Sequence, residues 1–238
     1  MGASTGPWYV TSVPLARWVF SGRAAGAATR STDELGTLWR PNAEGPLPLV
    51  IVFSESPGAL TWLASSIAAQ LSAVVLVPPV GADPGSVVTA AGGQAGRWGV
   101  DAARIAVLGE QRGTTAALSA VRPGPGSGPD SAPRAVARLA LVSPRLPEID
   151  DGVDLPPTLL QFSRSDADLA RVVAFEKRLR LQGVAVRATD YTDIADGWTR
   201  YPRAIRHSKR ALDDLVAFLR RGIGVDSTFD VIPGWDLH

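Results

Sequence analysis

A Gly-x-x-x-Gly motif, residues 109–113, separates an apolar run from a stretch of small residues. The apolar run, 104–108, is typical of a buried strand, and the small residues at 114–120 are typical of a helix. Glycines at both ends of such a junction permit a sharp turn that exposes the side chain at its centre. That side chain is Gln111, an amide that forms hydrogen bonds but cannot attack a carbonyl carbon.

The residue counts exclude several kinds of chemistry. The chain has no cysteine, which rules out disulfides, thiolate catalysis and cysteine-based zinc sites. Two histidines, His207 and His238, do not suffice for a multi-histidine metal centre, so we expect neither a metal nor another cofactor. A net charge of +1 gives no bulk electrostatic support for nucleic-acid binding or for an acidic partner.

Strand-like apolar runs alternate along the chain with segments of helical periodicity. The strands are expected at 47–53, 73–77, 104–108, 137–143, 157–163 and 184–191. The helices are expected at 59–71, 87–99, 114–120, 167–183 and 203–223. Continuous apolar runs indicate strands buried on both faces, and the alternation predicts an α/β fold, a mostly parallel sheet with helices on both faces.

One domain over residues 1–238 accounts for this order, because the alternation resumes after the Pro/Gly-rich loop at 122–133. Residues 1–30 are expected to form an N-terminal segment and residues 224–238 a C-terminal tail. The N-terminus lacks the basic and apolar regions of a signal peptide, and no uncharged apolar stretch reaches membrane-spanning length. A cytoplasmic location without membrane contact is the resulting expectation.

Three stretches in order resemble the α/β-hydrolase superfamily, and most closely the bacterial esterases related to hormone-sensitive lipase. They are LWRPNAEGPLPLVIVF (38–53), WGVDAARIAVLGEQRG (98–113) and RLRLQGVAVRATDYTDIADGW (178–198). The similarity spans roughly 30–221 and implies an α/β-hydrolase fold. It also implies a reduced or absent lid, since only 144–156 separate two of the expected strands.

The resemblance further implies a degenerate catalytic triad. Gln111 stands where the family has its nucleophilic serine, and Asp196 stands where it has histidine. Asp166 matches the family's catalytic acid by its distance from the end of the helix at 167–183. The family's oxyanion glycines correspond to 54–58, where Pro57 has no N–H and Glu55 adds negative charge.

Each candidate has two interpretations. Glu55 and Asp196 either share a water-poor pocket, where one pKa would rise and suit proton transfer, or face solvent. Asp166 is either a third acid or base, or the N-cap of the helix at 167–183. Gln111 binds either a ligand's carbonyl or hydroxyl group, or nearby backbone groups.

Further candidates for substrate binding flank these positions. They are Ser54, Ser56, Glu110, Arg112 and Trp198. Arg112 either pairs with Glu55, binds an acidic substrate, or lies on the surface. The other tryptophans considered are Trp39, Trp62 and Trp98, which are expected in the core or at its rim, and the basic residues of 200–210 are expected on a solvated helix face.

Three functional hypotheses follow. The first is a repurposed, non-hydrolytic enzyme that uses proton transfer on a small, partly apolar biosynthetic intermediate, as a cyclase, dehydratase or isomerase does. The second is a pseudoenzyme that binds a small ligand or a protein partner, with a homodimer or another protein covering an open site. The third is an esterase with a relocated nucleophile at Ser54, Ser56 or Ser163, none of which has an obvious histidine.

Overall fold

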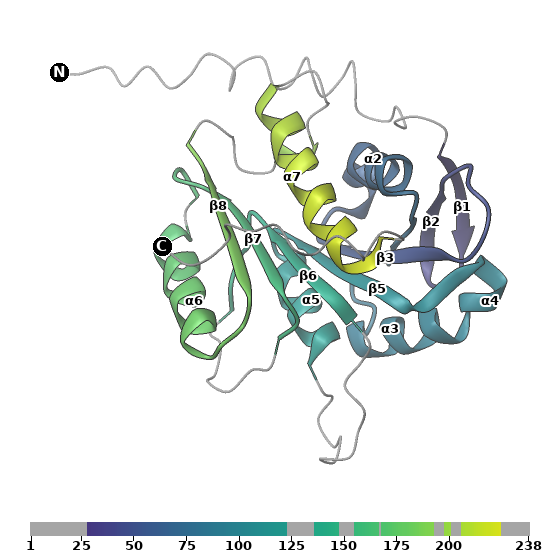
Figure 1. Cartoon of the computed structure of the whole chain (residues 1–238), viewed down its shortest axis with the longest axis horizontal. Helices are drawn as coiled ribbons and strands as arrows, with labels where there is room; N and C mark the ends of the chain where they lie inside the picture. The colour runs from purple at the N-terminus through teal and green to yellow at the C-terminus, as the bar shows by residue number, and fades with distance from the viewer. Residues whose placement is uncertain are drawn as a thin grey trace.

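The computed structural model describes residues 28–122, 136–147, 155–166, 168–192, 198–200 and 206–224. Within these residues the strands form one eight-stranded sheet in the order β1-β2-β4-β3-β5-β6-β7-β8 (Figure 1). The first two strands form an antiparallel hairpin, β2 is antiparallel to β4, and all remaining pairs are parallel. The predicted mostly parallel sheet is confirmed.

The bounds of the elements are as follows. The strands are β1 (Thr29–Asp33), β2 (Gly36–Arg40), β3 (Leu47–Ser54), β4 (Val74–Val77), β5 (Val100–Glu110), β6 (Val136–Val142), β7 (Thr158–Ser163) and β8 (Val186–Tyr191). The α-helices are α2 (Thr61–Leu71), α3 (Pro84–Gly93), α4 (Ala95–Trp98), α5 (Gly113–Val121), α6 (Leu169–Leu181) and α7 (Arg206–Ile223). Two short 3₁₀ helices are η1 (Pro57–Leu60) and η2 (Trp198–Arg200).

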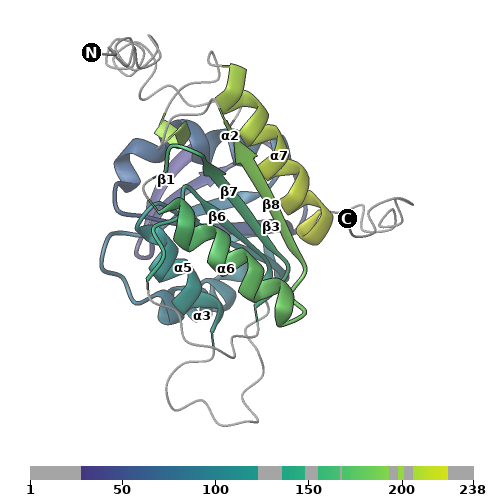
Figure 2. The same cartoon turned by 90° about the vertical axis from the view of Figure 1, so that its left-hand side faces the viewer.

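Helices cover both faces of the sheet because its central strands are apolar on both sides. In β3, Leu49 and Ile51 belong to the core cluster that includes α3, α5 and α6. Val50 and Val52 point the other way, into the cluster that includes α2 and α7. Figure 2 shows these two helical layers on either side of the strands. The alternation of side chains along a strand therefore converts one apolar run into two cores.

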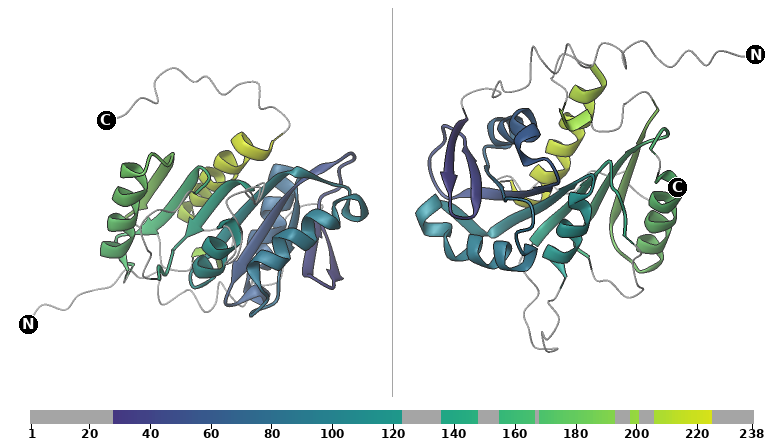
Figure 3. Two further views of the ribbon diagram at one scale, coloured as in Figure 1. Left: turned by 90° about the horizontal axis from the view of Figure 1, so that it is seen from below. Right: turned by 180° about the vertical axis from the view of Figure 1, so that it is seen from behind.

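The hairpin β1–β2 was not expected from the sequence. Residues 29–33 carry no large apolar side chain, and their exposed positions form the outer edge of the sheet. Only β2 contributes to the core there, through Leu38 and Trp39. Figure 3 shows the hairpin at the opposite end of the sheet from β8. The place of the hairpin in the sheet comes from the pairing of β2 with β4. This is a long-range contact that a local apolar pattern does not encode.

The bounds predicted for the helix at 87–99 are wrong. It begins earlier, at Pro84, where the Asp83 side chain accepts a hydrogen bond from the Ser86 backbone N–H at 2.7 Å. It is also divided at Gln94 into α3 and the single turn α4. An aspartate N-cap followed by proline is a strong start signal, and the glycines before Gln94 weaken the continuation.

Other expectations fall on particular segments. The last helix is confirmed, and His207 lies within it. None of the helices in the described ranges is long and apolar enough to cross a membrane. Most of the N-terminal segment, nearly all of the tail, the loop at 123–135 and the middle of the 144–156 segment lie outside the described residues.

Candidate functional site

The carboxyl ends of four parallel strands bring the candidate residues to one edge of the sheet. The strand ends are in register: Ser54 pairs with Glu110, Glu110 with Val142, and Val142 with Gln161. Open α/β sheets bind their ligands at this edge. The segments that follow β3, β5 and β7 therefore form the candidate site.

Gln111 occupies a tight turn between β5 and α5. Its φ of +50° lies in the left-handed region, which non-glycine residues rarely adopt. The strained backbone is held by three hydrogen bonds: Gln111 N–H donates to Val142 O at 3.0 Å, and Gln111 O accepts from the N–H groups of Thr114 at 3.1 Å and Arg145 at 3.2 Å. Such strain persists where the surroundings over-determine it, which is frequent at functional sites.

Both glycines of the motif are required by close packing. A Cβ at Gly109 would lie 2.8 Å from Thr114 Cα, and one at Gly113 would lie 2.1 Å from the carbonyl oxygen of Phe53. The backbone of α5 therefore begins directly against β3. The structure has the sharp strand–turn–helix junction that the motif predicts.

Glu110 lies at the centre of a buried hydrogen-bond cluster. Its side chain is fully buried, with the Ser54 hydroxyl donating to Oε2 and the Thr199 hydroxyl donating to Oε1, each at 2.7 Å. Ser54 Oγ in turn accepts from the Ser56 backbone N–H at 3.0 Å. We call these residues, Ser54, Ser56, Glu110 and Thr199, the Glu110 cluster. It joins the end of β3, the β5 turn and η2.

The Glu110 side chain is directed into the protein, and its contact with substrate stays a prediction. Successive side chains leave a strand on opposite sides, so the turn that presents Gln111 directs Glu110 into the protein. A buried carboxyl group needs hydrogen-bond partners, and the two hydroxyl groups supply them. Glu110 thus connects three segments at this edge of the sheet.

A small pocket lies beside the turn, between the segment after β3 and the one after β4. Its volume is about 200 Å³. The lining is mostly apolar or glycine, with three polar side chains; it comprises Phe53, Ser54, Glu55, Pro78, Pro79, Val80, Gly81, Ala82, Arg112, Gly113 and Ala116. Arg112 Nε lies 3.5 Å from Glu55 Oε2. The Arg112 side chain is 79% exposed and that of Glu55 39%, so this is a solvent-screened pair worth about 0–1 kcal/mol.

Comparison with known proteins identifies the fold. No family model matches the sequence, and no curated protein matches it either. Among solved structures, esterase LipW from Mycobacterium marinum superposes with a TM-score of 0.68 at 18% identity, covering 90% of this chain and 87% of the esterase. The chain has the α/β-hydrolase fold.

Two further structures give the same result. The esterase of the archaeon Pyrobaculum calidifontis has a TM-score of 0.67 at 15% identity, with 89% of this chain and 90% of the esterase covered. A bacterial heroin esterase reaches 0.70 at 16% identity and covers 90% of each chain. The expected resemblance to bacterial esterases is confirmed at the level of the fold.

Asp166 follows β7 in this α/β-hydrolase fold, but it is not an N-cap. Helix α6 begins at Leu169, and its N-cap position is Asp168, without a side-chain hydrogen bond. Asp166 is buried, and its Oδ2 accepts from the Ser163 backbone N–H at 2.9 Å. The carboxylate therefore stabilises the turn after β7, and the capping interpretation is wrong. The turn forms because both the backbone and the side chain of Asp166 bond to Ser163.

The remaining candidates divide between the core and the residues outside the described ranges. Trp198 is 1% exposed and packs edge-on against Trp62, with ring centroids 6.4 Å apart. It is a core residue, and its expected contact with substrate stays a prediction. Trp39, Trp62 and Trp98 are buried as expected. Asp196 lies outside the described residues, and its role stays a prediction.

Sequence reasoning missed Thr199 and a second, partly buried network around Tyr191. Gln161 Nε2 donates to the Tyr191 hydroxyl at 3.0 Å, and that hydroxyl donates to Asp214 Oδ2 at 2.7 Å. Arg187 donates to the other oxygen of Asp214 at 3.2 Å. This network fixes α7 to strands β7 and β8. No local pattern marks it, because its members are distant in sequence and carry no motif.

Burial and the hydrogen bond to Asp214 raise the pKa of the Tyr191 phenol above its ordinary value of 10.0. An unfolded chain loses this proton near pH 10, whereas the folded chain keeps it. The contribution of the protonated Tyr191 phenol to the free energy of unfolding is therefore fully present below about pH 10, and it is lost as the pH rises through the folded-state pKa. For Tyr191→Phe we expect a shallower alkaline decline in the free energy of unfolding, with slopes differing by up to about 1.4 kcal/mol per pH unit. Urea unfolding at a series of alkaline pH values measures this, and parallel profiles would contradict it.

No group of three or more histidine, aspartate or glutamate side chains within the described ranges is placed to hold a metal ion.

Proposed function

We propose that this chain is a non-hydrolytic α/β-hydrolase-fold protein with a degenerate triad. In this proposal it binds a small, partly apolar organic molecule at the carboxyl edge of the sheet and acts on it by proton transfer. The observation that carries the proposal is Gln111 at the strained turn, with φ of +50°. An amide held there offers hydrogen bonds to a ligand but cannot form an acyl-enzyme.

The pocket beside the turn supports the ligand class. Its apolar part, around Phe53 and Val80, suits a hydrocarbon group, and its volume of about 200 Å³ suits a molecule smaller than a typical drug. Ser54, Glu55 and Arg112 line the same pocket and supply polar contacts. A ligand with one apolar and one polar end matches this division.

Glu55 is the carboxylate that we assign to proton transfer. It lines the pocket, and Arg112 Nε lies 3.5 Å from its carboxylate. Asp166 is occupied by the backbone of Ser163, so its proposed part is to shape the loop after β7. Asp196 is proposed as the second acid or base.

The first test asks whether a nucleophile exists. We expect no labelling of the native protein by a fluorophosphonate probe and no hydrolysis of p-nitrophenyl acetate above that of the unfolded chain, because Gln111 cannot be acylated. Intact-protein mass spectrometry measures the labelling, with an active serine esterase as the positive control. Stoichiometric labelling would overturn the proposal, and Ser→Ala variants at positions 54, 56 and 163 would then locate the nucleophile.

A second candidate function is a non-catalytic receptor. The observation that favours it is the exposure of Glu55, because an open, solvated site does not exclude water from a reacting ligand. Compounds that raise the melting temperature of the protein are its ligands, and whether the protein converts them distinguishes the two functions. An enzyme converts such a compound, and Glu55→Gln abolishes the conversion while the protein stays folded. A receptor binds the compound and returns it unchanged.

A further inference from the structure

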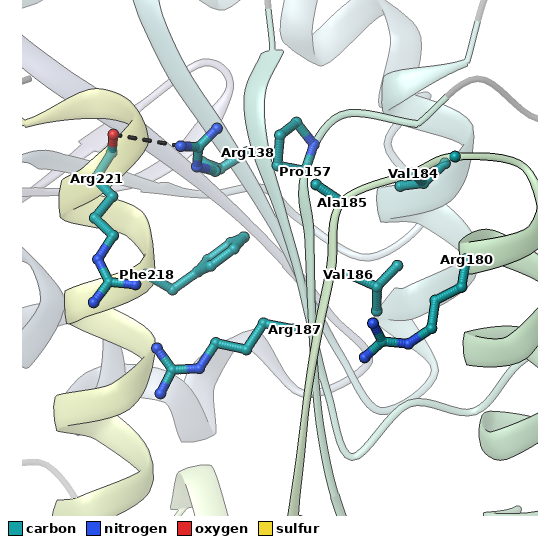
Figure 4. A pocket seen from close by; sticks show the side chains of 10 residues that line it. Arg138, Pro157, Arg180, Val184, Ala185, Val186, Arg187, Phe218 and Arg221 are labelled. Carbon is teal, nitrogen blue, oxygen red and sulfur yellow. Dashed lines mark hydrogen bonds between the residues drawn. The ribbon is translucent and has the colours of Figure 1, made fainter. Parts of the chain in front are cut away.

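A groove lined by arginines lies at the opposite edge of the sheet, at the amino ends of β6, β7 and β8. Its volume is about 540 Å³ (Figure 4). Four of its ten lining residues are arginines, namely Arg138, Arg180, Arg187 and Arg221. The other six are apolar or glycine: Pro157, Gly183, Val184, Ala185, Val186 and Phe218. The lining that the described residues provide is therefore cationic or apolar.

The four arginines come from four different elements, and helix ends explain only two of them. Arg180 and Arg221 belong to the last turns of α6 and α7, where exposed carbonyl groups favour cations. Arg138 and Arg187 belong to β6 and β8, and strands have no comparable dipole. Their convergence on one groove requires the tertiary arrangement.

Carboxylates contact this lining from outside the groove. Asp214 Oδ1 lies 3.2 Å from Arg187, and Glu176 Oε1 lies 2.9 Å from Arg180. Neither carboxylate lines the groove. The pairs hold their guanidinium groups in place, and a guanidinium group has five N–H donors in a planar fork that matches an oxyanion.

An aromatic ring forms part of the same surface. Phe218 is 7% exposed, and the guanidinium carbon of Arg138 lies 5.8 Å from its ring centroid. In Figure 4 the ring of Phe218 points into the groove, with Arg187 and Arg221 on the same side of β8. A flat ring of a ligand would find an aromatic partner in Phe218. A charged group attached to that ring would lie within reach of the guanidinium donors.

The size and charge of the groove select a small ligand. About 540 Å³ lies within the range of small-molecule sites. The whole chain carries a net charge of only +1, which gives no bulk electrostatic support for nucleic-acid binding and favours a small anion. We infer that this groove binds a small organic anion, a carboxylate or phosphate attached to a flat apolar ring.

Calorimetric titration of the full chain tests this second site. The probes are phenyl phosphate and benzoate, with phenol and inorganic phosphate as single-feature controls. We expect at least one of the two ring-bearing anions to bind more tightly than either control, and the stronger of the two identifies the preferred oxyanion. Equal affinity for phenyl phosphate and inorganic phosphate, together with no binding of benzoate, would overturn the inference.

Matched variants test whether the anion binds in this groove. Arg221→Gln is expected to weaken binding of the preferred anion about tenfold, the equivalent of one charge-assisted hydrogen bond. Arg220→Gln removes the same charge from the same helical turn, but Arg220 donates to the Gln70 carbonyl and does not line the groove, so it should bind as the parent does. Arg187→Gln provides a second variant if Arg221→Gln fails to fold.

Equal binding by the Arg220 and Arg221 variants would overturn the inference, since it would show a non-specific charge effect. Glu55→Gln is expected to leave this binding unchanged, because Glu55 belongs to the pocket at the other edge of the sheet. A failure of this inference is thereby distinguishable from a failure of the proposed function.

Discussion

Gly113→Ala is expected to lower the free energy of unfolding by about 3 kcal/mol or more, at the upper end of the range for overpacking. The added Cβ would lie 2.1 Å from the Phe53 carbonyl oxygen and 2.7 Å from the Ser54 backbone nitrogen. Both contacts are backbone atoms of a central strand, so a rotamer change cannot relieve them. Chemical denaturation monitored by circular dichroism measures the loss.

Gly92→Ala is the matched control for this variant. Gly92 lies in α3, and a Cβ built there meets nothing within 4 Å. Alanine at such a helical position is expected to stabilise the protein by about 0.5–1 kcal/mol. If Gly113→Ala behaves like Gly92→Ala, then α5 does not begin against β3 and the tight turn at Gln111 is wrong.

Glu110→Ala is expected to destabilise the protein by about 3–5 kcal/mol, because it combines a buried cavity with unpaired polar groups. The hydroxyl groups of Ser54 and Thr199 would each lose their carboxyl acceptor in a largely buried region. Glu110→Gln keeps the shape and one acceptor oxygen, so it should recover a large part of the loss. Urea unfolding of the three proteins at neutral pH measures the series.

A double-mutant cycle with Thr199→Val tests the connection across the site. Val preserves the volume of Thr199 and removes its hydroxyl group. If Glu110 and Thr199 are coupled, the effects of Glu110→Ala and Thr199→Val will differ from additivity by about 0.5–3 kcal/mol. Additive effects would show that Glu110 does not position η2, and the Glu110 cluster would then have no role in organising the site.

The order of the site segments could be predicted from the sequence, but the direction of each side chain could not. Gly109 and Gly113 identify the turn because their spacing is local and their packing leaves no room for a Cβ. Glu110 carries no such signal, since its partner Thr199 is 89 residues away. The same limitation explains why the capping interpretation of Asp166 was wrong. An aspartate that stabilises a turn with Ser163 and an aspartate that caps the next helix cannot be told apart from the sequence.

Trp198 illustrates the same distinction. The resemblance to esterases places it beside the site. Whether an aromatic residue there faces a ligand or the core depends on what packs against it, and Trp62 of α2 fills that space. Burial of a large aromatic side chain stabilises the core irrespective of any ligand.

The sequence by itself determined the mostly parallel sheet, the two helical layers and the strand–turn–helix junction that presents Gln111. These features follow from local apolar periodicity and from glycines at fixed spacing. Only the tertiary structure decided that Glu110 turns inward to Ser54 and Thr199, and that four arginines from four elements line one groove. Both depend on which distant segments pack together, because burial and hydrogen-bond partners are properties of the folded surroundings and not of the residue alone.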